Sequence, residues 1–309
     1  MSKILGVDNG YRFTKTSKGI CIGSSITKGI DVYNKDVIQV KIGNQDYIVG
    51  EEDGEYISDA DKLKTPENKE NLKVCTLTAI GLSFPNDPLI EITFVGGLPA
   101  GFFKDQRILF ENEIRNMTGK IYINKVGFEQ TIIIKDVFTF PQSAGIVFSK
   151  ASEVKKDTSL VIDIGGGTWD VTSFNGLKML DAQTFQAGML VLDTEIAQHL
   201  NNNYYTNYEP YQIYDLKQRG YFTVDGEKKS MNETHEIIKK HVANLEPKLK
   251  RQFNYNQFDH IFLIGGGAAE IRPYLAQYMK IEDSMENEQF SNANCYELMG
   301  KMALSSKNN

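Results

Sequence analysis

Short apolar runs recur along the chain, and turn-forming residues separate them. Residues 4–8, 89–95, 160–162 and 258–264 are such runs, and each predicts a buried strand. Residues 232–251 instead carry apolar side chains at helical spacing, which predicts an amphipathic helix. Strands that alternate with helices in this way predict an α/β fold.

The same patterns predict the other elements. Further strands are expected in residues 37–50, 121–129, 131–138, 169–174 and 177–185. Further helices are expected in residues 71–83, 103–114, 142–151, 188–200, 212–219 and 292–305. Pro247 is expected to kink or restart the helix of residues 232–251.

The stretch LVIDIGGGTWDVTSF, residues 160–174, contains the strongest candidate site. A buried strand delivers Asp163, then Gly165, Gly166, Gly167 and Thr168 form a turn into a second strand. Glycines let backbone N–H groups close around an anion such as phosphate. Asp163 would repel phosphate unless a divalent cation lay between them, so the stretch indicates Mg²⁺. The alternative is a plain hairpin with a glycine-rich turn.

A similar unit lies at the start of the chain. The run ILGVD ends at Asp8, Asn9 and Gly10 form a turn, and a strand returns through Lys15. Two copies of a strand, an acid and a glycine hairpin suggest two similar α/β domains that hold the phosphates of a nucleotide between them. Asn-Gly is also the commonest hairpin signal, and Lys15 alone reads as a solvated strand residue.

Two more segments fit a phosphate chemistry. Gly265, Gly266 and Gly267 join a strand to a helix that opens at Ala268, which allows close approach of a ligand to a helix N-terminus. Gln142, expected in the first turn of a helix, could orient a water for attack on a γ-phosphate. A polar first-turn residue without a role is the alternative for Gln142.

Composition excludes several classes of function. The 309 residues carry a net charge of −6, which disfavours direct DNA binding. The three cysteines are far apart and contain no CxxC, so neither a disulfide framework nor a zinc site is expected. No apolar run is long enough to span a membrane, and no leader precedes the first strand. A cytoplasmic protein is expected.

These motifs together resemble the actin, Hsp70 and sugar-kinase superfamily. The matching segments are GVDNGYRFTK, FPQSAG, LVIDIGGGTWDVT and IFLIGGGAAEI. Within the superfamily the chain looks most like the bacterial actin-like proteins of the plasmid-segregation type (ParM or StbA-like). GGLPAGFFKDQR and ANCYELMGK carry that closer resemblance, at residues 96–107 and 293–301.

The resemblance implies an actin-like fold. Two similar α/β domains, with mixed five-stranded sheets and flanking helices, would surround a central nucleotide cleft. Residues 1–158 and 291–309 would form the first domain, with a small insertion at about 31–72. Residues 159–290 would form the second, with a small insertion at about 201–255.

The resemblance also implies roles for single residues. Asp8 and Asp163 would hold Mg²⁺ through water, Gln142 would place the attacking water, and Asp170 would assist. Many bacterial relatives carry Glu where this chain has Gln142. The nucleotide ligands implied are Asn9, Gly10, Tyr11, Lys15, Gly165, Gly166, Gly167, Thr168, Gly188, Lys217, Gln218, Gly265, Gly266, Gly267 and Ala268.

The function implied is an ATPase, with GTP as a possible substrate, that polymerises on binding nucleotide. The filament would grow by head-to-tail contacts with other copies and would segregate plasmid DNA through a DNA-binding adaptor on the plasmid centromere. One alternative is a non-polymerising kinase or phosphotransferase of the same fold, although no sugar-binding segment is evident. Another is a cell-shape scaffold filament on membranes, which would need an amphipathic N-terminal helix rather than a strand.

Overall fold

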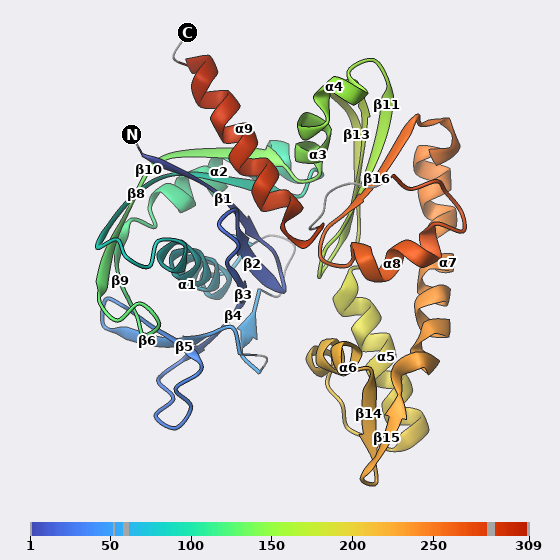
Figure 1. Ribbon diagram of the computed structural model, residues 1–309, viewed down its shortest axis with the longest axis horizontal. Helices are drawn as coiled ribbons and strands as arrows, with labels where there is room; N and C mark the ends of the chain where they lie inside the picture. Colours follow the sequence, from blue (N-terminus) through green and yellow to red (C-terminus); the bar gives the residue numbers. More distant parts are fainter. Residues whose placement is uncertain (1, 52, 58–61, 283–287, 308–309) are drawn as a thin grey trace. The chain divides into compact units, whose positions relative to one another are not determined.

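The chain forms two units of strands and helices in the computed structural model (Figure 1). Unit 1 comprises residues 1–153 and 285–309, and unit 2 comprises residues 154–284. The structure describes residues 2–51, 53–57, 62–282 and 288–307. Within them, no helix is both long enough and apolar enough to cross a membrane.

Unit 1 is built on one mixed sheet with the strand order β3-β2-β1-β8-β10-β9-β5-β6-β4-β7. The strands are β1 Lys3–Asn9, β2 Phe13–Thr16, β3 Cys21–Gly23, β4 Ser25–Lys28, β5 Ile38–Ile42, β6 Gln45–Val49, β7 Glu55–Tyr56, β8 Leu89–Leu98, β9 Gly119–Ile123 and β10 Glu129–Pro141. The prediction of a five-stranded sheet is wrong here, because β5 pairs with β9 and so adds the insertion's strands to the same sheet. β1, β8 and β10 are parallel, so their carboxyl ends meet at one edge.

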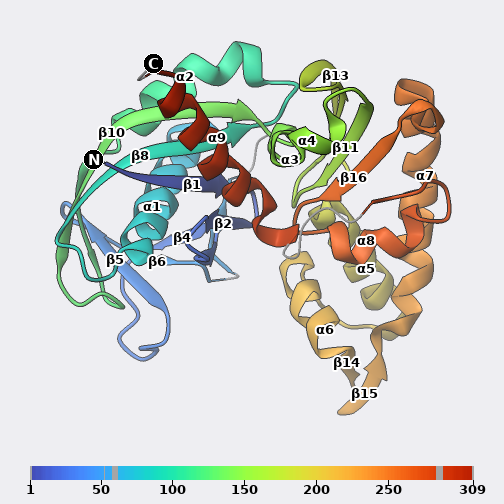
Figure 2. The ribbon, with the colours of Figure 1, turned by 45° about the horizontal axis from the view of Figure 1, so that its top comes forward.

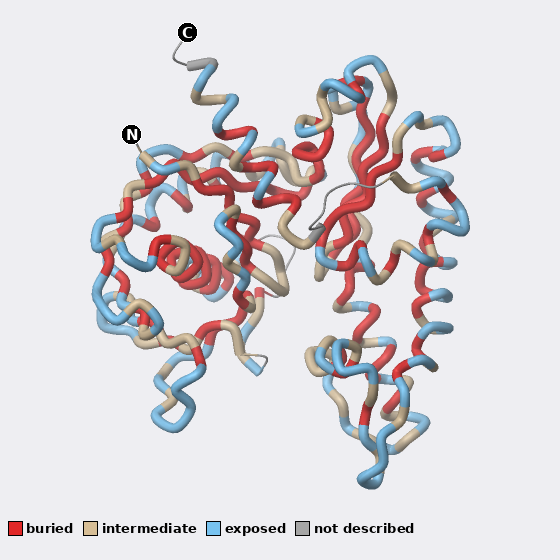
Figure 3. The backbone as a smooth tube through the Cα atoms, in the orientation of Figure 1, coloured by how far each residue is buried: buried red, intermediate tan, exposed pale blue. Residues whose placement is uncertain are grey.

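Helix α1 (Pro66–Ser83) lies inside the curve of this sheet (Figures 1 and 2). Its second half is buried almost all round, as the tube coloured by burial shows (Figure 3). The helix begins earlier than residue 71, because the Thr65 hydroxyl caps it by accepting the N–H of Asn68 at 3.1 Å. Pro66 fits the first helical position, where no N–H is needed.

Helices α2 (Phe103–Arg115), α3 (Ala144–Ser149), α4 (Ala151–Val154) and α9 (Ser291–Lys307) complete unit 1. Helix α9 lies on the sheet face opposite α1: Gly6 meets its backbone, while Leu5 and Val7 pack in the core that contains α1. A Cβ on Gly6 would lie 2.8 Å from the amide nitrogen of Glu297, so only glycine allows this contact. The predicted C-terminal helix thus packs against the first strand.

Unit 2 has a four-stranded sheet of order β13-β12-β11-β16 and a separate hairpin, β14–β15. The strands are β11 Thr158–Ile164, β12 Trp169–Asn175, β13 Lys178–Phe185, β14 Tyr221–Val224, β15 Glu227–Ser230 and β16 His260–Ile264. β11 and β16 are parallel, and the other pairs are antiparallel. This sheet also differs from the five strands expected.

The helices of unit 2 are α5 Met189–Tyr204, α6 Ile213–Arg219, α7 His235–Phe253 and α8 Ala268–Leu275. Leu192, Ile196 and Leu200 of α5 are fully buried in one core with the sheet and the other helices. Helix α7 continues through Pro247 to Phe253. Of the two expectations for this proline, a kink or a restart of the helix, the restart is therefore wrong.

Candidate functional site

The Gly165–Thr168 turn lies between β11 and β12 and is held from one side by helix α5. The carbonyls of Gly165, Gly166 and Gly167 accept the N–H groups of Met189, Leu190 and Gly188 at 3.0, 2.8 and 3.1 Å. In a trans peptide the N–H points opposite to the C=O. The N–H groups of residues 166–168 therefore face away from α5, as an anion nest requires.

Gly188 serves this turn directly. A Cβ at Gly188 would lie 2.5 Å from the amide nitrogen of Thr168 and would meet the backbone of Gly166 and Gly167 as well. Glycine is needed there so that the start of α5 can approach the turn closely. The structure thus places Gly188, one of the nucleotide ligands that the resemblance implies, behind the turn.

Two buried carboxylates sit beside the turn on facing strands. Asp163 of β11 and Asp170 of β12 are directly opposite in the antiparallel register, so their side chains share one face of the sheet. The hydroxyls of Thr168 and Thr184 donate to Asp170 at 2.7 and 2.5 Å and fix its position. Two like charges this close repel each other unless a cation or a proton compensates them.

The third glycine turn lies against the second. The N–H of Gly267 donates to the carbonyl of Ile164 at 3.0 Å, and Gly265 has a positive φ of 94°. Side chains at Gly265 or Gly267 would collide with Asp163, Ile164 or Met189. Gly266 is exposed, and a Cβ added to it would meet no heavy atom within 4 Å, so packing does not require glycine there. Ala268 follows at the start of α8.

Lys217 of α6 joins three helices of unit 2. Its ammonium lies 2.6 Å from the buried Asp193 of α5 and 2.9 Å from Glu270 of α8. Lys217 is thereby brought to the helix that follows the third glycine turn. Gln218 is exposed on α6, and the structure places it in no such contact with that helix.

The predicted site residues of unit 1 gather on the β1–β2 hairpin. Asp8 and Lys15 are paired across the two strands, and their charged atoms lie 3.1 Å apart. Lys15 also donates to the carbonyl of Gln289 at 3.1 Å. The N–H of Gly10 donates to the carbonyl of Phe13 at 3.0 Å and closes the turn that Asn9 and Tyr11 flank.

Gln142 lies at the same sheet edge but not in a helix. β10 runs to Pro141, the N–H of Gln142 donates to Leu98 at 2.7 Å, and α3 starts only at Ala144. The expected first-turn position is therefore wrong, because Pro141 ends a strand instead of starting a helix. Since β1 and β10 end at one edge, the structure still brings Gln142 and the Asp8 hairpin to that edge.

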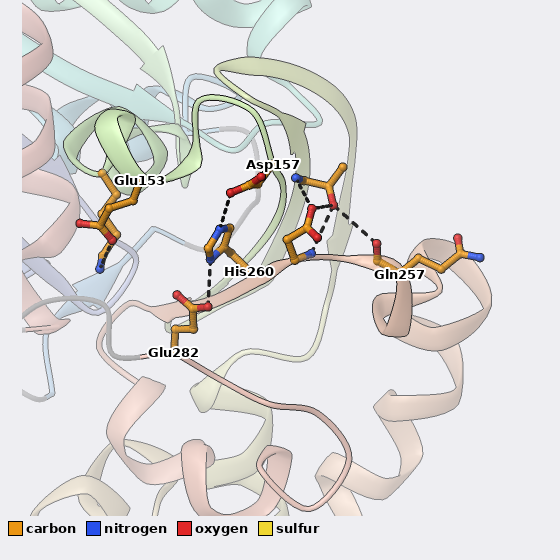
Figure 4. Close-up of polar contacts among 8 residues, drawn as sticks. Glu153, Asp157, Gln257, His260 and Glu282 are labelled. Carbon is orange, nitrogen blue, oxygen red and sulfur yellow. Dashed lines mark hydrogen bonds and ion pairs between the residues drawn. The ribbon is translucent and has the colours of Figure 1, made fainter.

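A separate polar cluster surrounds His260 at the start of β16 (Figure 4). Its Nδ1 lies 2.9 Å from Glu282 and its Nε2 lies 3.2 Å from Asp157. Burial disfavours the charged ring, but the bonds to Glu282 and Asp157 outweigh it and raise the pKa of His260 above 6.5. The cluster joins the first and last segments of unit 2.

Sequence reasoning missed Lys62 and Asp193. Lys62 donates to the carbonyl of Asn9, and its ammonium lies 5.0 Å from the centre of the Tyr11 ring. Nothing in the polar segment around Lys62 distinguishes it. Asp193 does have a signal, because it shares the apolar face of α5 with Met189 and Ile196.

The donor set in unit 2 fits a divalent cation held through water. Asp163 and Asp170 offer carboxylate oxygens, which Mg²⁺ prefers, on one face of the sheet. No group of three or more metal-ligating side chains is found in the described part of the chain. The described residues therefore do not indicate a Mg²⁺ ion held by protein side chains alone. Mg²⁺ commonly keeps several water ligands and takes only one or two carboxylates from the protein.

Two family models together match most of the chain. Residues 6–145 match "Actin like proteins N terminal domain", and residues 154–304 match "Plasmid segregation protein ParM, C-terminal". The chain belongs to the ParM-type actin-like proteins. No curated protein matches the chain.

Solved structures of ParM and other actin-like proteins share the fold. A 15-stranded ParM filament from Clostridium botulinum has 22% identity and a TM-score of 0.81, covering 98% of this chain and 100% of that one. Apo psk41 ParM has 19% identity and a TM-score of 0.71, covering 99% of each chain. The archaeal actin homolog Ta0583, in complex with ADP, has 16% identity and a TM-score of 0.78, covering 97% and 99%. These likenesses confirm the predicted actin-like fold.

Proposed function

We propose that the protein binds a nucleoside triphosphate with Mg²⁺, hydrolyses it and polymerises in the bound state. ATP is the expected nucleotide, and GTP is the alternative. The observation that carries the proposal is the Gly165–Thr168 turn, whose glycine carbonyls are all bound by the start of α5. Its N–H groups are left facing away from α5, and the buried Asp163 lies on β11, the strand that leads into the turn.

Each of the two hairpins offers its own candidate phosphate ligands. Asn9, Gly10, Tyr11 and Lys15 would meet the β- and γ-phosphates from unit 1, and the Gly165–Thr168 turn would meet them from unit 2. The exposed Gly266, where packing does not require glycine, supports a ligand that approaches the third turn closely. The adenosine side would be bound by residues 265–268, with Lys217 and Gln218 near the ribose or base.

Asp8 and Asp163 would hold Mg²⁺ through water, and the bound ion would supply charge neutralisation at the phosphates. Asp170, fixed by two threonine hydroxyls, would assist from the facing strand. Gln142 would orient the attacking water from the edge where β10 ends.

Assembly follows from the family rather than from a motif. Solved relatives include a ParM filament and an Alp12 filament, which supports head-to-tail contacts between copies of this chain. A heterologous contact that does not close into a ring generates a helical filament. With a net charge of −6, the filament would reach plasmid DNA through a DNA-binding adaptor.

Phosphate release from ATP and GTP, with and without Mg²⁺, tests the enzymatic part of the proposal. We expect Mg²⁺-dependent release from at least one nucleotide. Release that requires a small hydroxylated substrate would instead favour a kinase of the same fold. Absence of both binding and release with either nucleotide would contradict the proposal.

A further inference from the structure

Helix α7 is positively charged although the chain as a whole is acidic. The chain has 40 acidic and 34 basic residues, whereas α7 has five lysines and arginines against two glutamates. One of these glutamates, Glu246, accepts the hydroxyl of Tyr255. The five basic residues are all exposed. We call them the basic face of α7: Lys239, Lys240, Lys248, Lys250 and Arg251.

Three residues of the basic face form a row on the side of α7 that faces away from the core of unit 2. Lys248 and Arg251 follow Lys240 by eight and eleven residues, a spacing that the helical period places in one row about 16 Å long. Figure 3 shows exposed residues along this outer side of the helix. The opposite side packs into the core through Ile238, Val242, Leu245 and Leu249.

The charges of this row are not neutralised by other described parts of the chain. Lys217 of the same unit is held by two carboxylates, but Lys240, Lys248 and Arg251 form no ion pair with any described residue. Lys248 and Arg251 are one turn apart, where like charges repel each other. The negative end of the helix stabilises a cation in its last turn, which accounts for Arg251 but not for the other two. Folding of α7 therefore does not explain the row.

The chemistry of the row indicates an acidic partner surface. Helix α7, which the structure describes in full, exposes no large apolar side chain, so the row is not an apolar docking surface. The rest of the chain is more acidic than the whole, because α7 contributes positive charge. A second copy of the chain therefore offers the complementary charge. Two copies of α7 would repel each other, so α7 must meet a different surface of that copy.

We propose that the basic face of α7 is a contact between copies of this chain, covered in the assembly by an acidic surface of the neighbouring copy. The contact joins two different surfaces, so it can repeat from copy to copy without closing on itself. Its charges are exposed in the single chain, so salt weakens the contact. The proposal rests on the proposed assembly and names one of its surfaces.

The test is a charge reversal in the full chain, with Lys240→Glu, Lys248→Glu and Arg251→Glu combined. The matched control combines Lys155→Glu, Lys156→Glu and Lys178→Glu, which change the net charge equally at exposed residues of the same unit outside α7. Urea unfolding first shows that each variant folds, and calorimetry measures its affinity for a non-hydrolysable Mg²⁺-ATP analogue. Sedimentation with Mg²⁺-ATP or Mg²⁺-GTP at low and high salt then gives the threshold protein concentration for a pellet.

We expect the reversal on α7 to raise the threshold about tenfold or more at low salt, as the loss of three ionic contacts implies. The control should raise it less than about threefold, and both variants should bind the nucleotide as the unmodified chain does. High salt should raise the threshold of the unmodified chain more than that of the α7 variant. An unchanged threshold in the α7 variant, or an equal rise in the control, would overturn the proposal while leaving assembly intact. If the unmodified chain forms no pellet with either nucleotide, the proposed assembly itself fails and the contact fails with it.

Should the triple variant not fold, the neutral pair Lys248→Gln and Arg251→Gln carries the test, with Lys155→Gln and Lys156→Gln as its control. The pair on α7 should raise the threshold about threefold at low salt and the control should not. An equal threshold for the two pairs would contradict the proposal. Duplex DNA is added to the unmodified chain as a further arm. DNA binding that the α7 variant loses, with no change in its threshold, would assign the basic face to nucleic acid instead.

Discussion

The substitution Gly265→Ala tests how the third glycine turn is built against Asp163. Gly265 has a φ of 94°, where a residue with a Cβ costs about 1–2 kcal/mol. The added Cβ would lie 2.6 Å from the Ile164 carbonyl and closer still to Oδ1 of Asp163. Relieving such an overlap costs about 1–3 kcal/mol more. Together these effects predict a loss of about 2–5 kcal/mol in the free energy of unfolding of unit 2.

Gly266→Ala is the matched control in the same turn. Gly266 has no positive φ, and its Cβ would meet no heavy atom within 4 Å. A glycine-to-alanine change at a compatible position stabilises by about 0.4–1 kcal/mol through the unfolded chain. We therefore expect this variant to unfold at the same urea concentration as the unmodified protein or slightly above it.

The assay is urea unfolding followed by tryptophan fluorescence. The chain has a single tryptophan, Trp169, which is fully buried in β12 of unit 2. Its signal reports unit 2 without interference from unit 1, so a linear extrapolation gives the free energy for that unit. Equal midpoints for the two alanine variants would refute the reasoning about the turn.

Three further predictions concern other parts of the molecule. Asp163→Ala should lower ATP hydrolysis at least about 100-fold without unfolding the chain, whereas the exposed Asp215→Ala should not; full activity in the first variant would remove Asp163 from the site. His260→Gln should lower the unfolding midpoint more near pH 5.5 than near pH 9. The raised pKa of His260 gives stability that is present below about pH 6.5 and is lost as pH rises through the pKa of His260 in the folded protein. An equal loss at both pH values would contradict this. Gly97→Val should lower the melting temperature by several degrees or more. Even a Cβ at this position would lie 2.9 Å from Cε1 of Tyr296 in α9 and closer still to the Tyr296 hydroxyl. An unchanged melting temperature would contradict this prediction and show that α9 can move.

The hairpins could be predicted from sequence because their signals are local. The runs before Asp8 and Asp163 are apolar, and the turns that follow contain glycine, so both pattern and turn chemistry indicate the same elements. The start of α1 was also predictable in principle, since Thr65 and Pro66 form an N-terminal helix signal. The first residues of α1 are polar, so no apolar periodicity marks where this helix begins.

Long-range pairing could not be predicted in this way. Nothing in residues 38–42 shows that β5 will pair with β9 and extend the sheet of unit 1 to the strands of the insertion. For the same reason the sequence offered no sign that Lys62 would reach Asn9. The resemblance includes Gly188 among the nucleotide ligands, but its place behind the Gly165–Thr168 turn depends on how α5 docks. Such contacts arise from packing between segments far apart in the chain.

The domain bounds and the roles of single site residues stay predictions. Each unit by itself gathers its own group of candidate ligands, on the Asp8 hairpin in one and around Asp163 in the other. The Asp163→Ala variant addresses one of those roles directly.

Sedimentation of the purified chain tests the central claim, that bound nucleotide drives assembly. The protein is centrifuged at high speed with Mg²⁺-ATP, with Mg²⁺-GTP and without nucleotide, over a range of protein and salt concentrations. We predict a pellet above a threshold protein concentration with at least one triphosphate, none without nucleotide, and none for Asp163→Ala. No pellet under any of these conditions, or a pellet that forms equally well without nucleotide, would contradict the account.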